Sequence, residues 1–326
     1  MKASSNLLFL SLASYVVALP PGGSRAAPSS CNSKTSLTLL YQNNLNFTDD
    51  KNHISFILLD PLDHVEGSAA CASISENLLS VTAIRAHSSD VQSQLSYLAY
   101  AGRAKSTQQY YIQDGIVEVT EGPRFQPVLK AVQNSHRKLP VLCTQSSIGN
   151  SPSNSVATAS NQMVVQSNSN SFVGFRNQKS FRFQGIPFAD KPNRFEYSHV
   201  YTGRDQVIDA TKYGPDCSQP YDSNSSEDCL FINIQTPYIP QAGRKNDLRP
   251  VHFWIYGGGF TGGSGASAGS DGGQVASRED IVVVEINYRL TTLGFLAIPG
   301  TNITGNYGIS DQVTGLEWTI QNIAAF

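Results

Sequence analysis

The stretch GASAG at residues 265–269 fits the pattern G-x-S-x-G, which can present a serine hydroxyl as a nucleophile for acyl transfer. That chemistry needs a buried strand that leads into a strained turn and a helix that leaves it. Here segments rich in glycine and serine flank the match on both sides, and no apolar strand precedes it. We therefore interpret Ser267 as a loop residue and the match as a chance one, in a chain with 26 glycines.

The composition indicates a globular protein that can bury a sizeable core and form two domains. The chain has 326 residues, of which 40% are hydrophobic and 10% aromatic. Its net charge is −2 and its isoelectric point is near 6.3. This charge balance excludes nucleic acid and anionic membranes as expected partners.

The N-terminus has the features of a secretory signal peptide. Lys2 provides the positive charge, residues 7–17 the apolar core, and Ala18 ends a small-residue cleavage site. The apolar run is too short to span a bilayer, and no other stretch approaches that length, so no transmembrane segment is expected. We expect residues 1–18 to be a signal peptide, residues 19–30 to be disordered, and the protein to be secreted.

Secretion favours disulfides over metal ligation for the five cysteines, because no C-x-x-C or clustered His/Cys spacing occurs. Cys217 and Cys229 would close a short loop, and Cys71 and Cys143 form a second expected pair, which leaves Cys31 single. No metal and no cofactor are expected. Three sequons predict glycosylation, at Asn46, Asn224 and Asn302.

A polar segment without charged residues divides the sequence into two parts. No charged residue occurs from residue 144 to 175, and residues 144–156 form a Ser/Asn-rich linker that does not order itself by burying apolar surface. Residues 31–143 mix short strand-like runs with a helical stretch around 69–79, which predicts a small α+β domain. Its cysteine layout resembles a C-type-lectin-like module, although the acidic/Asn calcium loop of such lectins is not evident.

The part after the linker, residues 157–326, has the pattern of an α/β domain. Strand-like runs occur at 231–236, 251–256 and 281–288, and a helical pattern occurs at about 309–325. Residues 281–284 are continuously apolar, as in a strand covered on both faces. We therefore expect helices on both sides of a sheet.

Six motifs in this second part resemble the type B carboxylesterase family, the cholinesterase and fungal esterase-lipase group of the α/β-hydrolase fold. They are FQGIPFA (183–189), DATKYGPDCSQ (209–219), SEDCLFINIQTP (226–237), WIYGGGF (254–260), INYRLTTLGFLA (286–297) and GNYGISDQ (305–312). The resemblance implies an incomplete α/β-hydrolase fold, the N-terminal part of the central sheet, preceded by the small α+β domain. It also implies a serine-nucleophile hydrolase that acts on small-molecule or lipid esters.

The resemblance assigns roles to individual residues. In the family the GGGF loop supplies two oxyanion-hole amides, which fall on Gly258 and Gly259. Because a tetrahedral oxyanion needs donors at close range, residues without a Cβ suit this position. Cys217 and Cys229 match the first disulfide of the family. Glu227 matches a carboxylate that forms a structural ion pair with an arginine, for which Arg194 is the first candidate and Arg182 the second.

The same resemblance places the nucleophile elbow after the helix that ends near Phe326, so we expect the catalytic serine, the acid and the histidine beyond this chain. No catalytic residue is expected within it. The six histidines fit this expectation, because none is placed to activate a serine. They are His53, His64, His87, His136, His199 and His252.

Two hypotheses follow. The first is a secreted carboxylic ester hydrolase of which this chain is the N-terminal part, inactive as given because it is truncated. The second is a non-catalytic carboxylesterase-like protein with a role in binding or adhesion. A strand, a G-x-S-x-G sequence and a helix beyond Phe326 would distinguish the first from the second.

Overall fold

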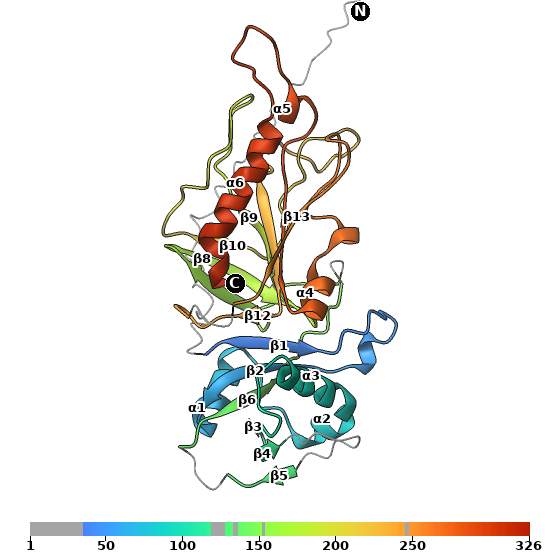
Figure 1. Ribbon diagram of the computed structural model, residues 1–326, viewed down its shortest axis with the longest axis vertical. Helices are drawn as coiled ribbons and strands as arrows, with labels where there is room; N and C mark the ends of the chain where they lie inside the picture. The colour runs from blue at the N-terminus through green and yellow to red at the C-terminus, as the bar shows by residue number, and fades with distance from the viewer. Residues whose placement is uncertain (1–34, 119–127, 133–135, 152–153, 245–247) are drawn as a thin grey trace, which may run out of the picture.

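Two β-sheets form the framework of the protein (Figure 1). The computed structural model describes residues 35–118, 128–132, 136–151, 154–244 and 248–326. The expected signal peptide, the disordered segment and Cys31 lie outside these residues. Among the described residues, one sheet has the strand order β12-β1-β2-β6-β3-β4-β5, and the other has the order β10-β8-β9-β11-β14-β13 with β7 paired to β8.

The first sheet is built almost wholly from the N-terminal part of the chain. Its elements are β1 (Leu37–Tyr41), η1 (Asp50–Asn52), β2 (Ser55–Leu62), α1 (His64–Ser73), α2 (Val81–Ala86), α3 (Ser88–Tyr100), β3 (Gln109–Ile112), β4 (Gly115–Glu118), β5 (Val128–Lys130) and β6 (Leu139–Thr144). Three consecutive helices separate β1 and β2 from the later strands, and the strand pairs are antiparallel except for β3 with β6, which agrees with the expected α+β pattern. The expected helix at 69–79 is wrong in its extent, because α1 begins at a capping box of Asp63 with Glu66 and ends before Ile74.

A disulfide fastens α1 to the sheet. Cys71 on α1 and Cys143 on β6 are both fully buried, and their Cα atoms lie 5.5 Å apart. The expected pairing of these two cysteines is therefore confirmed. The bond joins positions 72 residues apart, so it restricts the unfolded chain over most of this part of the sequence.

The second sheet belongs to the C-terminal part. Its strands are β7 (Gln162–Ser167), β8 (Asn170–Arg176), β9 (Phe181–Pro187), β10 (Val207–Asp209), β11 (Phe231–Thr236), β13 (Val251–Ile255) and β14 (Val282–Ile286). The remaining elements are η2 (Ala268–Ser270), α4 (Gly273–Glu279), α5 (Thr291–Phe295), α6 (Tyr307–Asn322) and η3 (Ile323–Ala325). The strands at 231–236, 251–255 and 282–286 lie where the apolar runs predict them.

Helices cover both faces of β14, as its continuous apolar run predicts. Gly315 of α6 lies against Ile286, and Gly272 at the start of α4 lies against Val283, whose side chain points to the opposite face. β14 pairs antiparallel with β11 and parallel with β13, so the sheet is mixed. Within the described part of the chain β13 is an edge strand, and it leaves Trp254 40% exposed.

The two sheets meet at a boundary that contains buried ion pairs. Lys179 lies 2.6 Å from Asp50, and Arg176 forms a second pair with Glu76; all four side chains are 2% exposed. Buried pairs need complete hydrogen bonding to offset their desolvation, and Glu76 also accepts hydrogen bonds from Thr144 and Ser146.

The segment expected to be an unstructured linker contributes to this boundary. Gln145 is buried and donates to the carbonyl of Asn177 at 2.6 Å, and Asn150 donates to Asp50 at 2.8 Å. The expectation considered only apolar burial, whereas polar side chains hold this segment through hydrogen bonds. The short strand β12 (Tyr238–Ile239) also crosses the boundary, because it pairs with β1 of the first sheet.

Candidate active site

The chain leaves β13 into a glycine loop whose backbone adopts left-handed conformations. Gly258 has φ of 140° and Gly259 has φ of 61°, and Phe260 continues the turn with φ of 63°. A Cβ on Gly258 would lie 2.0 Å from the carbonyl oxygen of Gly262, so only glycine fits there without rearrangement. Glycine is therefore needed at 258 because the carbonyl oxygen of Gly262 lies so close, and glycine suits 259 because the backbone there is left-handed.

The amide groups of this loop are available to a ligand. Gly258 uses its carbonyl, which accepts from the backbone and hydroxyl of Thr261 at 3.1 and 3.0 Å. Within the described chain no hydrogen-bond acceptor faces the N–H of Gly258 or of Gly259, and both residues are exposed. Two unpaired donors on consecutive glycines are what an oxyanion requires.

Side-chain amides hold in place the residues that come after Gly258 and Gly259 in the chain. Gln219 accepts from the N–H of Gly263 at 2.9 Å and donates to its carbonyl at 3.0 Å. Asn287 accepts from the N–H of Gly265 at 2.9 Å, and Asn233 donates to the carbonyl of the same residue at 3.0 Å. The loop after the oxyanion candidates is therefore anchored at both N–H and C=O groups, which limits reorganisation.

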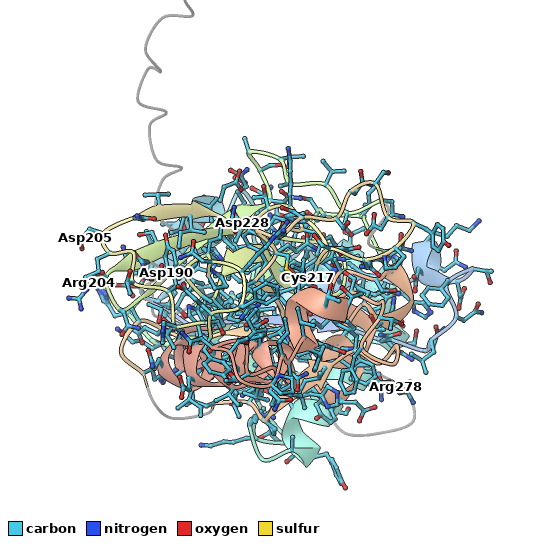
Figure 2. The ribbon with its side chains drawn as sticks, turned by 90° about the horizontal axis from the view of Figure 1, so that it is seen from above. Asp190, Arg204, Asp205, Cys217, Asp228 and Arg278 are labelled. Atoms are coloured by element: carbon cyan, nitrogen blue, oxygen red, sulfur yellow. A yellow bond between two sulfur atoms is a disulfide. The ribbon has the colours of Figure 1, made fainter. Side chains whose placement is uncertain are left out.

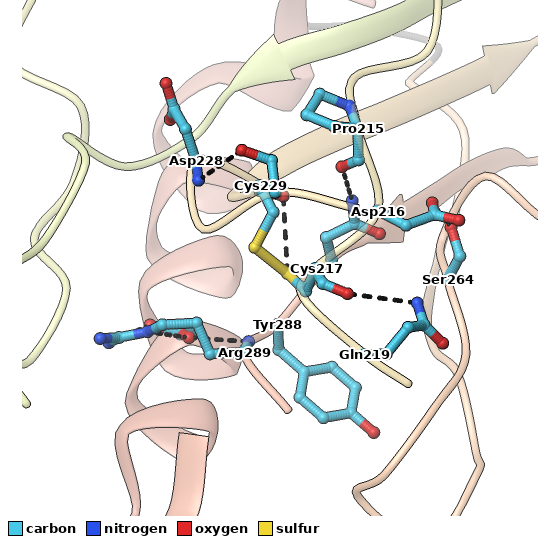
Figure 3. The surroundings of a disulfide bond; sticks show 12 residues. Pro215, Asp216, Cys217, Gln219, Asp228, Cys229, Ser264, Tyr288 and Arg289 are labelled. Atoms are coloured by element: carbon cyan, nitrogen blue, oxygen red, sulfur yellow. Dashed lines mark hydrogen bonds and ion pairs between the residues drawn. A yellow bond between two sulfur atoms is a disulfide. The ribbon is translucent and has the colours of Figure 1, made fainter. Parts of the chain in front are cut away.

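The disulfide between Cys217 and Cys229 supports these anchors (Figure 3). The two Cα atoms lie 4.9 Å apart, and both residues are buried. Next to the bond, Asp216 accepts from the hydroxyl of Ser264, and Gln219 donates to the carbonyl of Cys217 at 3.2 Å. The bond therefore fixes the segment from which Gln219 reaches the glycine loop.

A pair of tyrosines fixes the strand ends below the loop. The rings of Tyr256 and Tyr288 stack with centroids 4.4 Å apart, and each hydroxyl donates to the other residue's carbonyl, at 2.9 and 3.1 Å. Burial raises the pKa of both phenols above the ordinary value, so both remain neutral donors. This pair holds β13 and β14 together at the end where the glycine loop begins.

Ser267 lies outside this arrangement. It is exposed and precedes the short helix η2, and its carbonyl accepts from Ser270 at 3.1 Å. No strand leads into it, and its hydroxyl has no histidine partner in the described part of the chain. His252, which is nearest in sequence, lies exposed on the edge strand β13 and stacks on Trp254. The geometry gives Ser267 no base.

Of the two arginines considered for Glu227, Arg194 forms the pair. Its guanidinium contacts both carboxylate oxygens, but the side chains are 65% and 37% exposed. Arg182 instead pairs with Asp271 at the start of α4, where the arginine is 1% and the aspartate 8% exposed. The buried pair, which the sequence did not reveal, is the one that contributes to the framework.

A buried carboxyl lies next to this pair. Glu285 on β14 is 1% exposed, and burial raises its pKa to about 8, with a further increase from the charge of Asp271. Gln235 donates to one of its oxygens at 3.0 Å, and this hydrogen bond, the charge of Arg182 and the backbone of Gly272 each oppose part of the increase. At neutral pH this carboxyl is mostly protonated.

Several framework residues could not be singled out in advance. Asn233, Asn287 and Gln219 lie inside the motifs FINIQT, INYR and DCSQ, but nothing in a single sequence shows that their amides reach one loop. Arg289 and Asp311 form a buried bidentate pair at 2.8 Å between the end of β14 and α6. The sequence offers one indication of such framework residues, which is that each is a polar residue inside or beside an apolar strand.

A mixed sheet with helices on both faces, and a glycine loop with free amides after a parallel strand, define an α/β-hydrolase arrangement. The carboxylesterase family profile matches residues 161–326, which is about half of the chain. The protein therefore belongs to the carboxylesterase family.

Known relatives agree with this assignment. Human bile salt-activated lipase is 40% identical over 156 residues, which cover 44% of this chain and 20% of that protein. Esterase E4 of Myzus persicae is 38% identical over 182 residues, covering 52% and 33%. Para-nitrobenzyl esterase of Bacillus subtilis is 38% identical over 159 residues, covering 44% and 32%. The chain spans a fifth to a third of the length of these relatives.

Among solved structures, the Geobacillus stearothermophilus carboxylesterase Est55 at pH 6.2 is 41% identical to this chain with a TM-score of 0.46. The match covers 50% of this chain and 35% of that one. Residues 35–160 lie outside the family match.

Three further observations concern the described residues. No helix among them is both long and apolar enough to cross a membrane. Asn46, Asn224 and Asn302 are all exposed. The charged side chains of Arg204 and Asp205 project from a loop at the edge of the molecule in Figure 2, and both residues are exposed.

Proposed function

We propose that this protein is a carboxylic ester hydrolase in which Gly258 and Gly259 donate the oxyanion-hole hydrogen bonds. The observation that carries the proposal is the pair of unpaired, exposed amides in a loop anchored by Gln219, Asn233 and Asn287. Negative charge that develops on the ester oxygen would accept from both amides without rearrangement of the loop.

The reaction follows the serine mechanism. A serine attacks the ester carbonyl, a histidine takes and returns the proton, and an acid orients the histidine. We propose that these three groups are not among the 326 residues, and that the chain as given does not hydrolyse esters. The isolated position of Ser267 supports this proposal. The names of the relatives, lipase and esterase, support a small-molecule or lipid ester as substrate.

We further propose that the protein is secreted, with residues 1–18 as signal peptide, and glycosylated at Asn46, Asn224 and Asn302. Two disulfides support an oxidising compartment. We also propose the division into residues 31–143, a linker at 144–156, and the carboxylesterase part at 157–326. The separate β-sheets support it, although β12 crosses between them.

The experiment is to incubate the 326-residue chain with p-nitrophenyl esters and with a fluorophosphonate label. We expect hydrolysis no faster than a no-enzyme control and no labelled serine in a tryptic map. A phosphonylated Ser267 would show that the nucleophile lies within this chain. The Ser267→Ala variant is the control, because it removes the only hydroxyl with the G-x-S-x-G context and should behave as the parent does.

A further inference from the structure

A cavity of about 590 Å³ lies beside the loop that joins α5 to α6. Figure 1 shows this loop at the end of the molecule farthest from the first sheet. One wall of the cavity is the loop itself, through Asn302 and Thr304, and the other is the segment 190–199 that follows β9. The volume lies within the range of about 300–1,000 Å³ that ligand sites have. These lining residues do not include the glycine loop, so the cavity is separate from the candidate active site.

A glycosylation sequon forms part of this cavity. Asn302 and Thr304, the first and third residues of Asn-Ile-Thr, both line it. Asn302 is exposed, and its side-chain amide has no hydrogen-bond partner among the described residues. A glycan on this asparagine begins at the cavity wall, and the covalent bond keeps its first sugars there at a high effective concentration. The attachment point, rather than the polarity of the lining, therefore selects a saccharide as the occupant.

The turn that carries Asn302 is held by hydrogen bonds of its own. The N–H of Ile298 donates to the carbonyl of Ile303 at 2.8 Å. The hydroxyl of Thr301 donates to the carbonyl of Ile298 at 2.8 Å and accepts from the N–H of Ile303 at 3.1 Å. The backbone from which the glycan starts is therefore fixed, which reduces the entropy lost when its sugars pack against the protein.

Tyr197 joins the two walls of the cavity. Its hydroxyl lies 2.9 Å from the hydroxyl of Thr304 and donates to the carbonyl of Gly305 at 3.2 Å. Its ring lies against that of Tyr307 with centroids 5.2 Å apart, and the residue is still 46% exposed. A ring that is held in place but partly open offers a surface against which the C–H groups of a sugar can pack. Because Tyr197 contacts the sequon, this surface lies within reach of the first sugars on Asn302.

Polar side chains of the segment 190–199 also line the cavity. Lys191 donates hydrogen bonds, Asp190 accepts them, and the imidazole of His199 does either. Asp190, labelled in Figure 2, already accepts from the N–H and the hydroxyl of Thr202 at 3.2 and 2.8 Å. The imidazole of His199 has no hydrogen-bond partner among the described residues, so it is available to a sugar hydroxyl.

We propose that the glycan on Asn302 folds back into this cavity, with Tyr197 packing against one of its first sugars and His199 bonding a sugar hydroxyl. The inference rests on the proposed glycosylation of Asn302 and goes beyond it by giving this glycan a place in the fold. The docked glycan covers the open part of the tyrosine ring and fastens the α5–α6 loop to the segment 190–199. It also shields the bond between asparagine and sugar from enzymes that cleave it.

The experiment is to produce the 326-residue chain in a eukaryotic secretory host and to treat it with peptide N-glycosidase in heavy-oxygen water. Cleavage converts each glycosylated asparagine to a labelled aspartate, so peptide mapping gives a separate rate for Asn46, Asn224 and Asn302. Unfolded protein treated in the same way corrects for differences in sequence. We expect folding to slow release at Asn302 more than at the other two sites. Tyr197→Ala and His199→Ala should each speed release at Asn302 about 3- to 10-fold, the effect of one lost ring contact or hydrogen bond.

Three variants separate docking from other effects. Tyr197→Phe keeps the ring and removes only the hydroxyl that contacts Thr304, so it should retain slow release. Tyr221→Ala is the matched control, because Tyr221 is fully exposed in the disulfide loop that carries Asn224, and it should change no rate. His199→Ala decides the matter if Tyr197→Ala does not fold.

The outcomes distinguish glycosylation from docking. An unmodified Asn302 in the peptide map would refute the glycosylation and, with it, the docked glycan. A glycan on Asn302 that is released equally fast from native and unfolded protein would refute the docking alone. Equal rates for the parent, Tyr197→Ala and His199→Ala, or a rate for Tyr197→Phe as fast as that for Tyr197→Ala, would also overturn the proposed contacts.

Discussion

Replacement of Glu285 by glutamine should make the protein more stable at alkaline pH and leave its stability at pH 4.5 nearly unchanged. Glu285 is 1% exposed, and burial next to Asp271 raises its pKa from the ordinary 4.5 to about 8. Gln235 donates to it, and Arg182 opposes part of the increase. The native state therefore retains a proton that the unfolded chain has already lost at neutral pH.

The sign follows from proton linkage. Between pH 4.5 and about 8 the native state binds one more proton than the unfolded state, so stability falls as pH rises. The loss is about 1.4 kcal/mol per pH unit, and it reaches about 5 kcal/mol once the native carboxyl has also ionised. Carboxyls whose pKa is lowered, such as Glu76, affect stability only at more acidic pH.

His53 also contributes to the decrease in stability as pH rises. Burial lowers the pKa of this imidazole, but the carboxylates of Asp90 and Asp49, at 2.9 and 3.0 Å, outweigh burial and raise it. Its stabilising effect is complete below the unfolded pKa and is lost as pH rises through the folded one. The contribution of Glu285 must therefore be read from the difference between variant and parent.

The assay is urea denaturation at intervals from pH 4.5 to 9 for the parent, Glu285→Gln and Glu279→Gln. Glu279 on α4 has a side chain that is 61% exposed, so its replacement should not change the pH dependence. We expect the stability of Glu285→Gln to exceed that of the parent by an amount that grows to about 5 kcal/mol. Parallel curves for all three proteins would refute the reasoning.

Three further predictions concern the framework. Arg182→Gln should lower the free energy of unfolding in urea by about 3–5 kcal/mol, because it leaves a buried carboxylate unpaired. Arg194→Gln changes an exposed pair and should leave the melting temperature unchanged. Equal losses of stability in the two variants would contradict this ranking. Replacing both Cys217 and Cys229 by serine should cost about 3 kcal/mol, and non-reducing peptide mapping of the parent should recover these two linked. Gly258→Ala should lower stability by about 1–3 kcal/mol, because its Cβ would meet a carbonyl oxygen at 2.0 Å; an unchanged melting curve would show that the loop is mobile.

Three strands and the long helix of the carboxylesterase part could be predicted because hydrophobic periodicity is a local signal, whereas β7, β8, β9 and β10 were not predicted. β11 has the predicted bounds, and β14 is buried on both faces, as its apolar run indicates. The helices α2 and α3 were not predicted, because α2 has only six residues and the buried side of α3 depends on contacts with distant strands.

Contacts between distant residues set the limit of prediction for the site. Gly258 and Gly259 could be proposed from a motif, since glycine itself is the signal. The pairing of Arg182 with Asp271 joins residues 89 positions apart, and that of Lys179 with Asp50 joins residues 129 positions apart. Charged residues at such separations have many possible partners, and only the fold selects one. The order of the linker could not be foreseen for the same reason.

The central claim is that the amides of Gly258 and Gly259 form the oxyanion hole. Its most direct test is the turnover of p-nitrophenyl esters by a family-length enzyme that contains this chain, with Gly259→Val and Ser267→Ala compared with the parent. A Cβ at 259 meets no atom within 4 Å, so Gly259→Val acts through the left-handed backbone and by covering the amide. The account predicts that Gly259→Val lowers kcat by about 10²- to 10³-fold, which is the usual effect of losing one oxyanion donor. Ser267→Ala should retain the kcat of the parent. A folded Gly259→Val enzyme with parental kcat, or an inactive Ser267→Ala enzyme, would contradict it.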